Sequence, residues 1–174
     1  MSRFIIRGGR RLSGTYVPGG NKNAVLPMLA ACVLTDEPVI LKNVPLIDDV
    51  RTMLELLGAL GVEISRKDHV VTLCAKGLRR SKLDEDLCRK VRSSILLAGP
   101  MAARLGRVTL SPPGGDVIGR RRLDTHFQGL QALGIEVTGG HHFVFRRKRL
   151  EGAAMVLDEA SVTATENVLM AATL

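Results

Sequence analysis

Apolar residues along the chain recur with two spacings that alternate in a fixed order. Residues 24–34 and 91–105 place them three or four positions apart, which is typical of one face of a helix. Short extended runs follow these segments at 39–41 and 108–110. A second helical pattern and an alternating stretch that doubles back on itself complete each set. The order helix, strand, helix and β-hairpin is therefore predicted twice.

A short motif marks both sets and indicates an internal duplication. The sequence ALGVEI at residues 59–64 returns as ALGIEV at residues 132–137. In each copy a glycine follows an apolar helix and is expected to end it before a strand begins. We expect the hairpin turns at 66–69 and 139–142. The second turn contains two adjacent histidines, which we interpret as turn residues rather than as metal ligands.

A third copy begins near the C-terminus. The related sequences MLAA, MAAR and MAAT start at positions 28, 101 and 170, so the same helix is marked three times. We expect a strand over 154–157 and a helix from Thr163, after which the sequence ends without another hairpin. The chain is therefore expected to be either a fragment or a protein that obtains the missing elements from another chain.

Composition favours an ordinary folded domain. Of the 174 residues, 45% are hydrophobic and 24% are charged. No apolar run approaches the roughly 18 residues that span a bilayer, and the first residues lack the pattern of a secretory signal, so we expect a cytoplasmic protein. The three cysteines show no CxxC spacing, which favours reduced structural thiols over a disulfide or a zinc site. No metal or cofactor is predicted.

The formal net charge of +8 predicts an anionic partner. Aromatic residues make up only 3% of the chain, which leaves few platforms for stacking bases, and the basic clusters match no nucleic-acid-binding motif. We therefore expect phosphate-rich small molecules rather than nucleic acid or a membrane. The cluster at 146–149 is interpreted as a solvated hairpin or loop.

One carboxylate stands among glycines and arginines between residues 110 and 126. Asp116 follows Gly114 and Gly115, which permit close backbone approaches, and precedes the arginine run 120–122. The pattern is typical of a proton-handling group beside an anion clamp. It is also compatible with a tight turn, a helix cap and solvated arginines, and both interpretations stay open.

A second cluster of chemistry lies at residues 19–27, with the sequence GGNKNAVLP. Lys22 and Asn23 come immediately before an apolar helix, whose N-terminal end exposes unpaired N–H groups and a partial positive charge. This arrangement predicts an anion-binding corner. The alternative is that Asn23 only caps the helix and that Lys22 is solvated.

Five motifs occur in order along the chain: GGNKNAVLP, EPVILKNVPLIDDV, VRSSILLAGPMAARLG, PGGDVIGRRRLDTH and EASVTATEN. Together they resemble the enolpyruvyl transferases over nearly the whole chain. The pair Lys22 and Asn23 is similar to members that act on UDP-N-acetylglucosamine, whereas members that act on shikimate 3-phosphate carry Lys-Ser. The resemblance implies transfer of the enolpyruvyl group of phosphoenolpyruvate to the sugar 3-hydroxyl with release of phosphate, the first committed step of peptidoglycan synthesis.

The resemblance also implies an α/β fold, an inside-out barrel of βαβαββ units. Two units, at about 19–82 and 83–150, would be complete, and a third, 151–174, would be truncated. Strands within residues 1–18 would belong to a second domain that is mostly missing. The chain would then be inactive alone and would pair with that C-terminal domain or self-associate. The alternative is a non-catalytic module that binds nucleotide sugars or other polyanions.

By the same resemblance, Asp116, Lys22 and Arg121 would be the catalytic residues. Lys22 and Arg121 would hold the phosphate of phosphoenolpyruvate, Arg92 would add positive charge, and Asp116 would donate the proton. Most members carry cysteine in place of Asp116, so the exchange implies insensitivity to fosfomycin, which alkylates that thiolate.

The resemblance assigns the nucleotide sugar to Arg92 and to three short segments. Arg122 and Thr125 depart from the family, which commonly has proline and leucine there, whereas His126 matches a family histidine. The contacts with UDP-N-acetylglucosamine would come from Asn23, Arg92, Arg121, Arg122, Leu123, Asp124, Thr125, Ser161, Val162 and Thr163.

Overall fold

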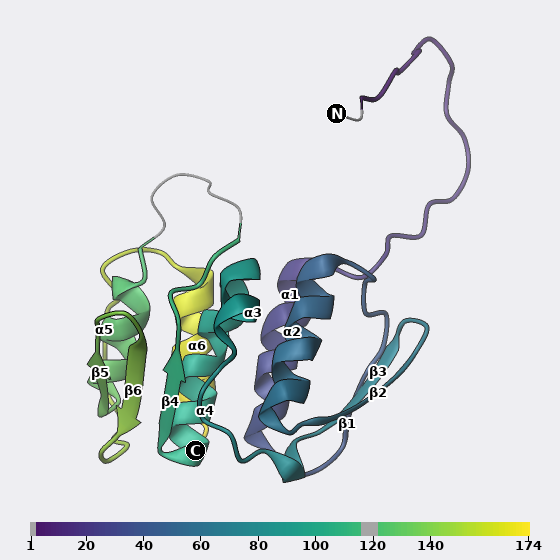
Figure 1. Ribbon diagram of the computed structural model, residues 1–174. Coiled ribbons are helices and arrows are strands. Elements are labelled where there is room, and N and C mark those ends of the chain that lie inside the picture. Colours follow the sequence, from purple (N-terminus) through teal and green to yellow (C-terminus); the bar gives the residue numbers. More distant parts are fainter. Residues whose placement is uncertain (1–2, 116–121) are drawn as a thin grey trace.

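The computed structural model describes residues 3–115 and 122–174, which form two similar halves side by side (Figure 1). In the first half, the elements are α1 (Lys22–Ala31), the 3₁₀ turn η1 (Cys32–Leu34), β1 (Val39–Leu41), α2 (Asp48–Leu60), β2 (Glu63–Lys67), β3 (Val70–Cys74) and the 3₁₀ turn η2 (Ala75–Gly77). In the second, they are α3 (Glu85–Lys90), the 3₁₀ helix η3 (Arg92–Leu97), α4 (Ala98–Leu105), β4 (Arg107–Leu110), α5 (Asp124–Ala132), β5 (Ile135–Thr138), β6 (Phe143–Arg147) and α6 (Val162–Ala171).

The two predicted sets are confirmed as two three-stranded antiparallel sheets with the same topology. Their strand orders are β1-β3-β2 and β4-β6-β5, so the hairpin of each set pairs through its second strand with the strand that precedes the helix. A parallel bridge between Lys82 and Thr109 adds a further extended segment beside β4. The order of elements therefore follows the duplication seen in the sequence.

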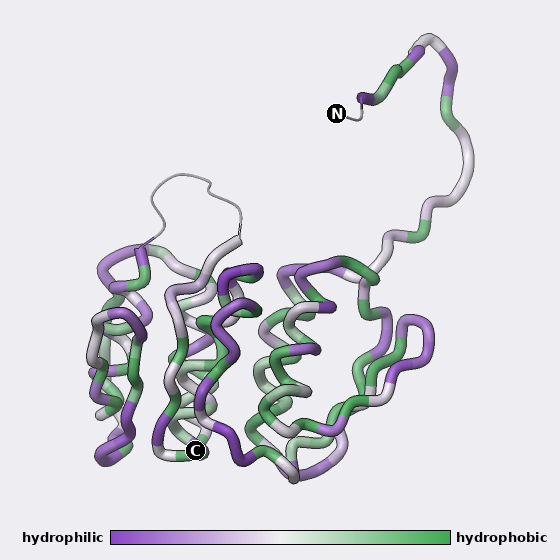
Figure 2. Tube along the Cα trace, in the orientation of Figure 1, coloured by the Kyte–Doolittle hydropathy of each residue, from purple (hydrophilic) through white to green (hydrophobic). Residues whose placement is uncertain are grey.

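Burial explains why most helical segments form where the apolar spacing predicts them, although the predicted helix at 91–105 is divided into the 3₁₀ helix η3 and the α-helix α4. The inner face of α2 buries Met53, Leu57 and Leu60, and the helix ends at Gly61, whose φ of 102° lies in the left-handed region. Figure 2 shows hydrophobic residues along the facing sides of the helices and polar residues at the tip of the β2–β3 hairpin. The helix α6 packs on both α4 and α5, and α1 contacts both η3 and α6, so one core joins the halves.

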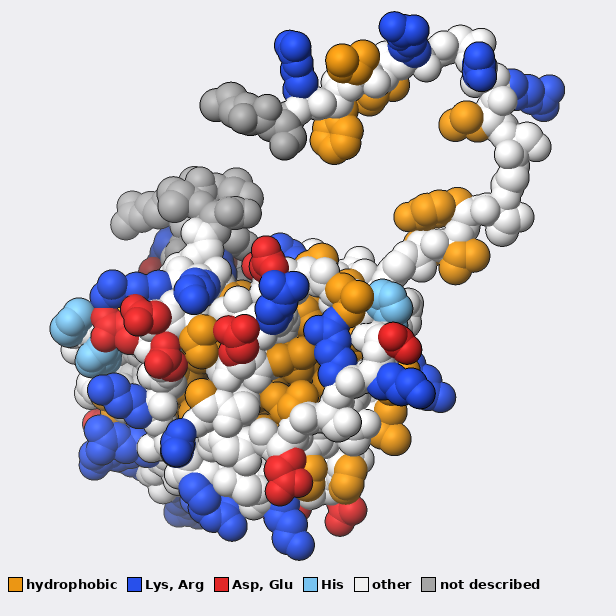
Figure 3. Space-filling model, turned by 45° about the vertical axis from the view of Figure 1, so that its right-hand side comes forward, with side chains coloured by type: hydrophobic (Ala, Val, Ile, Leu, Met, Phe, Trp, Pro, Cys, Tyr) orange, Lys and Arg blue, Asp and Glu red, His pale blue; other side chains and the backbone are white. Residues whose placement is uncertain are grey.

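One predicted strand is wrong, because residues 154–157 form none. Residues 4–6 and 15–17, which the resemblance implies would pair with a second domain, also form no strand here, and the N-terminal arm extends away from the rest of the chain (Figure 1). Figure 3 shows hydrophobic side chains along this arm, and Phe4 is 94% exposed. A strand needs a hydrogen-bonded neighbour, and the described residues offer none to these segments.

The first hairpin turn is shorter than predicted. Arg66 and Lys67 belong to β2, and the turn consists of Asp68 and His69 alone. Asp68 adopts a φ of 50°, a conformation that aspartate tolerates better than most side chains and that two-residue hairpin turns require. The second turn, 139–142, is confirmed.

Two further expectations concern membranes and cysteines. Within residues 3–115 and 122–174, no helix is long and apolar enough to cross a bilayer. The three cysteines are free, and Cys32 and Cys88 are buried. Burial raises the pKa of the Cys32 thiol to about 11, which suits an unreactive structural role.

Arg104 joins the two halves. Its guanidinium group is mostly buried, pairs with Asp36, and donates hydrogen bonds to the carbonyl oxygens of Val33, Thr35 and Ala75. These carbonyls belong to the first half of the chain, whereas Arg104 lies in α4.

Replacing Arg104 with methionine should lower the free energy of unfolding by about 2–4 kcal/mol, because several carbonyl groups lose a charged donor. Urea unfolding would measure the change. The matched control is Arg51→Met, which removes an exposed arginine that pairs with Asp48 and should change stability by less than about 0.5 kcal/mol. Equal effects of the two substitutions would contradict the junction role.

Candidate functional site

An open pocket of about 130 Å³ forms where the N-terminal ends of α1, α2, η3 and α6 meet. Each of these elements contributes a polar residue from its first two positions: Lys22, Asp49, Arg92 and Thr163. Helix N-termini present unpaired N–H groups and a partial positive charge. The full lining consists of Lys22, Asn23, Leu26, Asp49, Val91, Arg92, Ser93, Ile95 and Thr163.

The structure contradicts the alternative in which Asn23 only caps the helix and Lys22 is solvated. Asn21, rather than Asn23, caps α1: its side-chain oxygen accepts hydrogen bonds from the N–H groups of Asn23 and Ala24, at 2.8 and 3.2 Å. Asn23 is therefore the second residue of the helix and lines the pocket. Lys22 is not simply solvated, because its Nζ atom lies 2.6 Å from an oxygen of Asp49.

Asp49 is a pocket residue that the sequence analysis did not single out. It occupies the first turn of α2 together with Asp48, where a carboxylate is stabilised by the helix dipole. The motif VPLIDDV carries both acidic residues, and their place at the start of a helix is the sequence feature that could have identified Asp49. Because Asp49 neutralises Lys22 across the pocket, it can orient the ammonium group before an anion binds.

Arg92 and Ser93, the first two residues of η3, both line the pocket. Arg92 donates a hydrogen bond from Nη2 to the carbonyl oxygen of Arg122, at 3.3 Å, which ties η3 to the segment before α5. The hydroxyl of Ser93 is buried, and among the described residues it has no hydrogen-bond partner. A buried polar atom that lines a pocket in this way suits a bound polar ligand.

Arg122 and Thr125, where the family commonly has proline and leucine, both contact Asp158. The guanidinium of Arg122 lies 2.8 Å from Asp124 and 3.2 Å from Asp158, and the hydroxyl of Thr125 donates to Asp158 at 2.7 Å. The hydrogen bond and charge of Asp124, with the charge of Asp158, raise the pKa of Arg122. Asp158 was also missed by the sequence analysis, although it lies just before the quoted motif EASVTATEN.

The other predicted residues that the structure describes do not line this pocket. Leu123 immediately precedes α5 and packs against the core, whereas Ser161 caps α6 by accepting a hydrogen bond from the N–H of Ala164. Val162 is 75% exposed and, with Ser161, lines a separate shallow hollow. Asp116 and Arg121 lie outside the described residues.

The glycine turn before Asp116 behaves as the sequence predicts up to residue 115. A Cβ atom on Gly114 would stand 1.7 Å from the carbonyl oxygen of Arg89, so only glycine permits this close approach. The N–H of Gly114 donates to the carbonyl of Cys88, and that of Gly115 donates to the carbonyl of Arg89. These bonds fix the start of the loop against α3.

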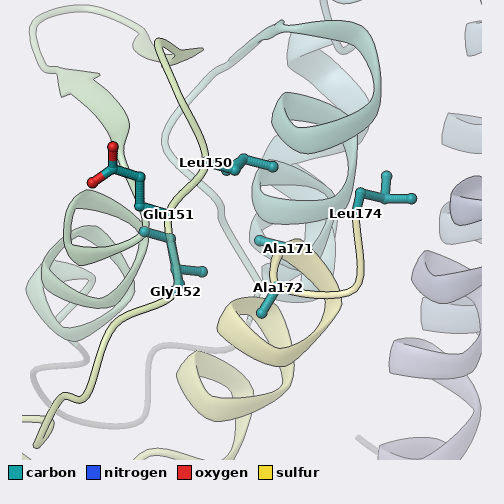
Figure 4. A pocket seen from close by; sticks show the side chains of 7 residues that line it. Leu150, Glu151, Gly152, Ala171, Ala172 and Leu174 are labelled. Carbon is teal, nitrogen blue, oxygen red and sulfur yellow. The ribbon is translucent and has the colours of Figure 1, made fainter.

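A second pocket, at the opposite end of α6, contains none of the predicted site residues. Figure 4 shows Leu150, Ala171 and Leu174 around it, with Glu151 as its ionisable residue. Within residues 3–115 and 122–174, no group of three His, Cys, Asp or Glu side chains lies close enough together to hold a metal ion. The rings of His141 and His142 stack on each other at 4.7 Å.

His126 is buried beneath the pocket. Its Nδ1 atom lies 3.1 Å from Asn167 Nδ2, and its Nε2 atom lies 3.3 Å from the hydroxyl oxygen of Thr163. Burial, helped by the charge of Arg92, lowers the pKa of His126 to about 4. The imidazole is therefore neutral at physiological pH.

The lowered pKa of His126 predicts a loss of stability in mild acid. Below pH 6.5, His126 binds a proton in the unfolded chain but stays neutral in the folded one. The free energy of unfolding therefore falls as the pH drops from 6.5 toward 4, by about 3 kcal/mol in total. Urea unfolding of the wild type and of His126→Gln between pH 7.5 and 4.5 would measure this change in the free energy of unfolding. We expect the difference in unfolding free energy between them to shrink as pH falls; a difference independent of pH would contradict the assignment.

Comparisons with known proteins place these observations in a family. The sequence pattern of the family described as EPSP synthase (3-phosphoshikimate 1-carboxyvinyltransferase) matches residues 6–174. A UDP-N-acetylglucosamine 1-carboxyvinyltransferase from Bradyrhizobium diazoefficiens is 52% identical over 98% of the chain and 40% of its own length. One with the same name from Treponema denticola is 51% identical over the whole chain and 41% of its length. The chain thus spans about two fifths of these relatives.

Solved structures support the fold. The enolpyruvyl transferase NikO from Streptomyces tendae superimposes with a TM-score of 0.68 at 24% identity, over 82% of this chain and 32% of that one. An EPSP synthase from Acinetobacter baumannii gives a TM-score of 0.71 at 20% identity, over 91% of this chain and 37% of its own. The mixed α/β fold is therefore shared with these proteins.

Proposed function

The chain belongs to the EPSP synthase family of enolpyruvyl transferases, and from this premise we propose that its protein transfers the enolpyruvyl group of phosphoenolpyruvate to the 3-hydroxyl of UDP-N-acetylglucosamine. The names of the relatives support this acceptor. The observation that carries the proposal is one pocket that unites Lys22, Asn23, Arg92 and Thr163 at several helix N-termini. Such a pocket suits a ligand with several negative charges.

In the proposed reaction, the 3-hydroxyl oxygen of the sugar bonds to C2 of phosphoenolpyruvate while C3 takes up a proton. The hydroxyl proton leaves, then C3 loses a proton and the C2–O bond to phosphate breaks, which restores the double bond and releases phosphate. Lys22, Arg92 and Arg121 would bind the anionic groups and stabilise the charge on the departing phosphate. The segments 122–125 and 161–163 would bind the nucleotide sugar.

The direct test uses the complete product of the reading frame that encodes this chain. Incubation with phosphoenolpyruvate and UDP-N-acetylglucosamine should release phosphate and form the enolpyruvyl sugar, detected by mass spectrometry. Binding of the nucleotide sugar without product would instead favour a non-catalytic binding module. Replacing the acceptor with shikimate 3-phosphate is the control for acceptor identity and should give no product.

We further propose Asp116 as the proton donor to C3. An anionic substrate beside a carboxyl group favours its protonated form, which can then act as a general acid. Asp116→Asn should lower kcat by about 100-fold or more, whereas Asp116→Cys, which restores the common family residue, should keep substantial activity. Turnover of Asp116→Asn at the wild-type rate would rule out this role.

The same proposal predicts insensitivity to fosfomycin. Opening the epoxide requires the thiolate that most members carry and that this chain replaces with Asp116. After incubation with the drug and UDP-N-acetylglucosamine, mass spectrometry should show no adduct on the wild type and one adduct on Asp116→Cys. A stable adduct on Asp116 would contradict the proposal.

The larger architecture is also a proposal. We propose an inside-out barrel in which 19–82, 83–150 and 151–174 are successive units and residues 1–18 pair with a second domain. The exposed apolar side chains of the N-terminal arm support this arrangement, because they suit burial against another sheet. A role in peptidoglycan synthesis, and through it in cell shape and division, would follow from the proposed activity.

A further inference from the structure

The side-chain amide of Asn167 has its orientation fixed by two backbone groups. Asn167 is fully buried in α6, and its Oδ1 atom accepts a hydrogen bond from the N–H of Gly99 at 2.8 Å. Its Nδ2 atom donates to the carbonyl oxygen of Ile95 at 2.9 Å. A backbone N–H only donates and a carbonyl oxygen only accepts, so the opposite orientation of the amide would lose both bonds.

This orientation determines where His126 carries its hydrogen. The second hydrogen on Asn167 Nδ2 points to His126 Nδ1 at 3.1 Å, so Nδ1 must be the unprotonated acceptor. The neutral ring then has its hydrogen on Nε2, which faces the hydroxyl oxygen of Thr163 at 3.3 Å. Protonation of Nδ1 would place two hydrogens against each other, which agrees with the lowered pKa of this histidine.

The position of the hydrogen on His126 also fixes the hydrogen-bonding role of the Thr163 hydroxyl. Its hydroxyl oxygen accepts the hydrogen of His126 Nε2, so its own hydrogen must point elsewhere. Thr163 lines the pocket together with Lys22 and Arg92. A phosphate oxygen only accepts hydrogen bonds, so a hydroxyl held as a donor beside two cations favours such a ligand.

We propose that Asn167 is a positioning residue that holds His126 in its Nε2–H form and thereby makes the hydroxyl of Thr163 a directed hydrogen-bond donor to a phosphate-bearing ligand. The identification of that ligand as UDP-N-acetylglucosamine rests on the proposed function. The chain of bonds itself does not, because it is complete without a ligand. It runs from the backbone of η3 and α4 through α6 to α5 and back to the pocket.

The first experiment measures the ring nitrogens of His126 by NMR in the protein without ligand. We expect a protonated Nε2 and an unprotonated Nδ1. Asn167→Asp replaces the donor with an acceptor of the same shape and should move the hydrogen to Nδ1 or protonate the ring. A wild-type ring with hydrogen on Nδ1 would overturn the proposal whatever the protein binds, and so would an Asn167→Asp ring unchanged from the wild type.

The second experiment uses the exposed position 163, where substitutions spare the core and the fold. Thr163→Val removes the hydroxyl at nearly constant shape and should weaken binding of UDP-N-acetylglucosamine about tenfold, as expected for one hydrogen bond to a charged group. Thr163→Ser keeps the hydroxyl and should bind within about threefold of the wild type. Equal affinities of Thr163→Val and the wild type would overturn the donor role.

Inorganic phosphate, titrated into the same three proteins, separates this inference from the proposed function. If the wild type fails to bind the nucleotide sugar but binds phosphate in a way that depends on the Thr163 hydroxyl, the proposed function is wrong and the donor role holds. If neither compound binds, the donor role is wrong as well.

Discussion

Replacing Lys22 with methionine is expected to lower kcat/KM of the complete gene product by about two to three orders of magnitude. Methionine keeps the length of the side chain and removes its charge, so the pocket loses a donor to the anionic substrate. The ammonium group of Lys22 also balances Asp49 at 2.6 Å, and its loss leaves a carboxylate that repels anions. Steady-state kinetics with phosphoenolpyruvate as the varied substrate would measure the effect.

Two further variants make this result interpretable. Lys67→Met removes an exposed lysine from the β2–β3 hairpin, away from the pocket, and should leave kcat/KM within about twofold of the wild type. Lys22→Met combined with Asp49→Asn removes the repulsion and should bind phosphoenolpyruvate more tightly than Lys22→Met alone. If Lys22→Met keeps wild-type kinetics, the pocket is not the phosphoenolpyruvate site.

Alanine substitutions at two helix-interior glycines should change stability in opposite directions. A Cβ atom on Gly99, in α4, would lie 2.5 Å from both the backbone and the side-chain oxygen of Asn167. We expect Gly99→Ala to lower the free energy of unfolding by about 2–3 kcal/mol, because α4 and α6 must separate and the buried hydrogen bond from Gly99 weakens.

The matched control is Gly58, in α2, where the nearest atom to an added Cβ is the Ile64 Cδ1 atom at 3.9 Å, an ordinary contact. Gly58→Ala should raise the free energy of unfolding by about 0.5–1 kcal/mol, since alanine restricts the unfolded chain and favours the helix. Urea unfolding of both variants gives the comparison. Stabilisation by both substitutions would mean that α4 and α6 do not approach each other this closely.

The repeated order of elements could be predicted from the sequence because helices and hairpins are encoded locally. Apolar spacing within α2 and the glycine at position 61 suffice to mark a helix and its end. The predicted strand at 154–157 has suitable residues but no partner among the described residues, and the spacing of residues within a strand does not reveal whether a neighbour is present. The two-residue turn at Asp68 was missed because it depends on a single positive φ.

The site was predicted in part for a similar reason. Lys22 and Asn23 stand out at a glycine-rich helix start, and a family resemblance added Arg92 and Thr163, which the fold brings into the same pocket. Asp49 contacts Lys22, which lies 27 positions away in the sequence, and Asn167 contacts His126, which lies 41 positions away. Nothing in the sequence alone indicates such pairings, because aspartate at a helix start and asparagine within a helix have ordinary local explanations.

The convergence of helix ends at the pocket has a consequence for how such a site can arise. Its walls come from α1 and α2 in the first half of the chain, and from η3 and α6 in the second. A single repeat, even one able to fold, would present only some of these charges on an open surface. The pocket therefore depends on all of these segments packing together, and no single one of them would hold its full set of polar residues.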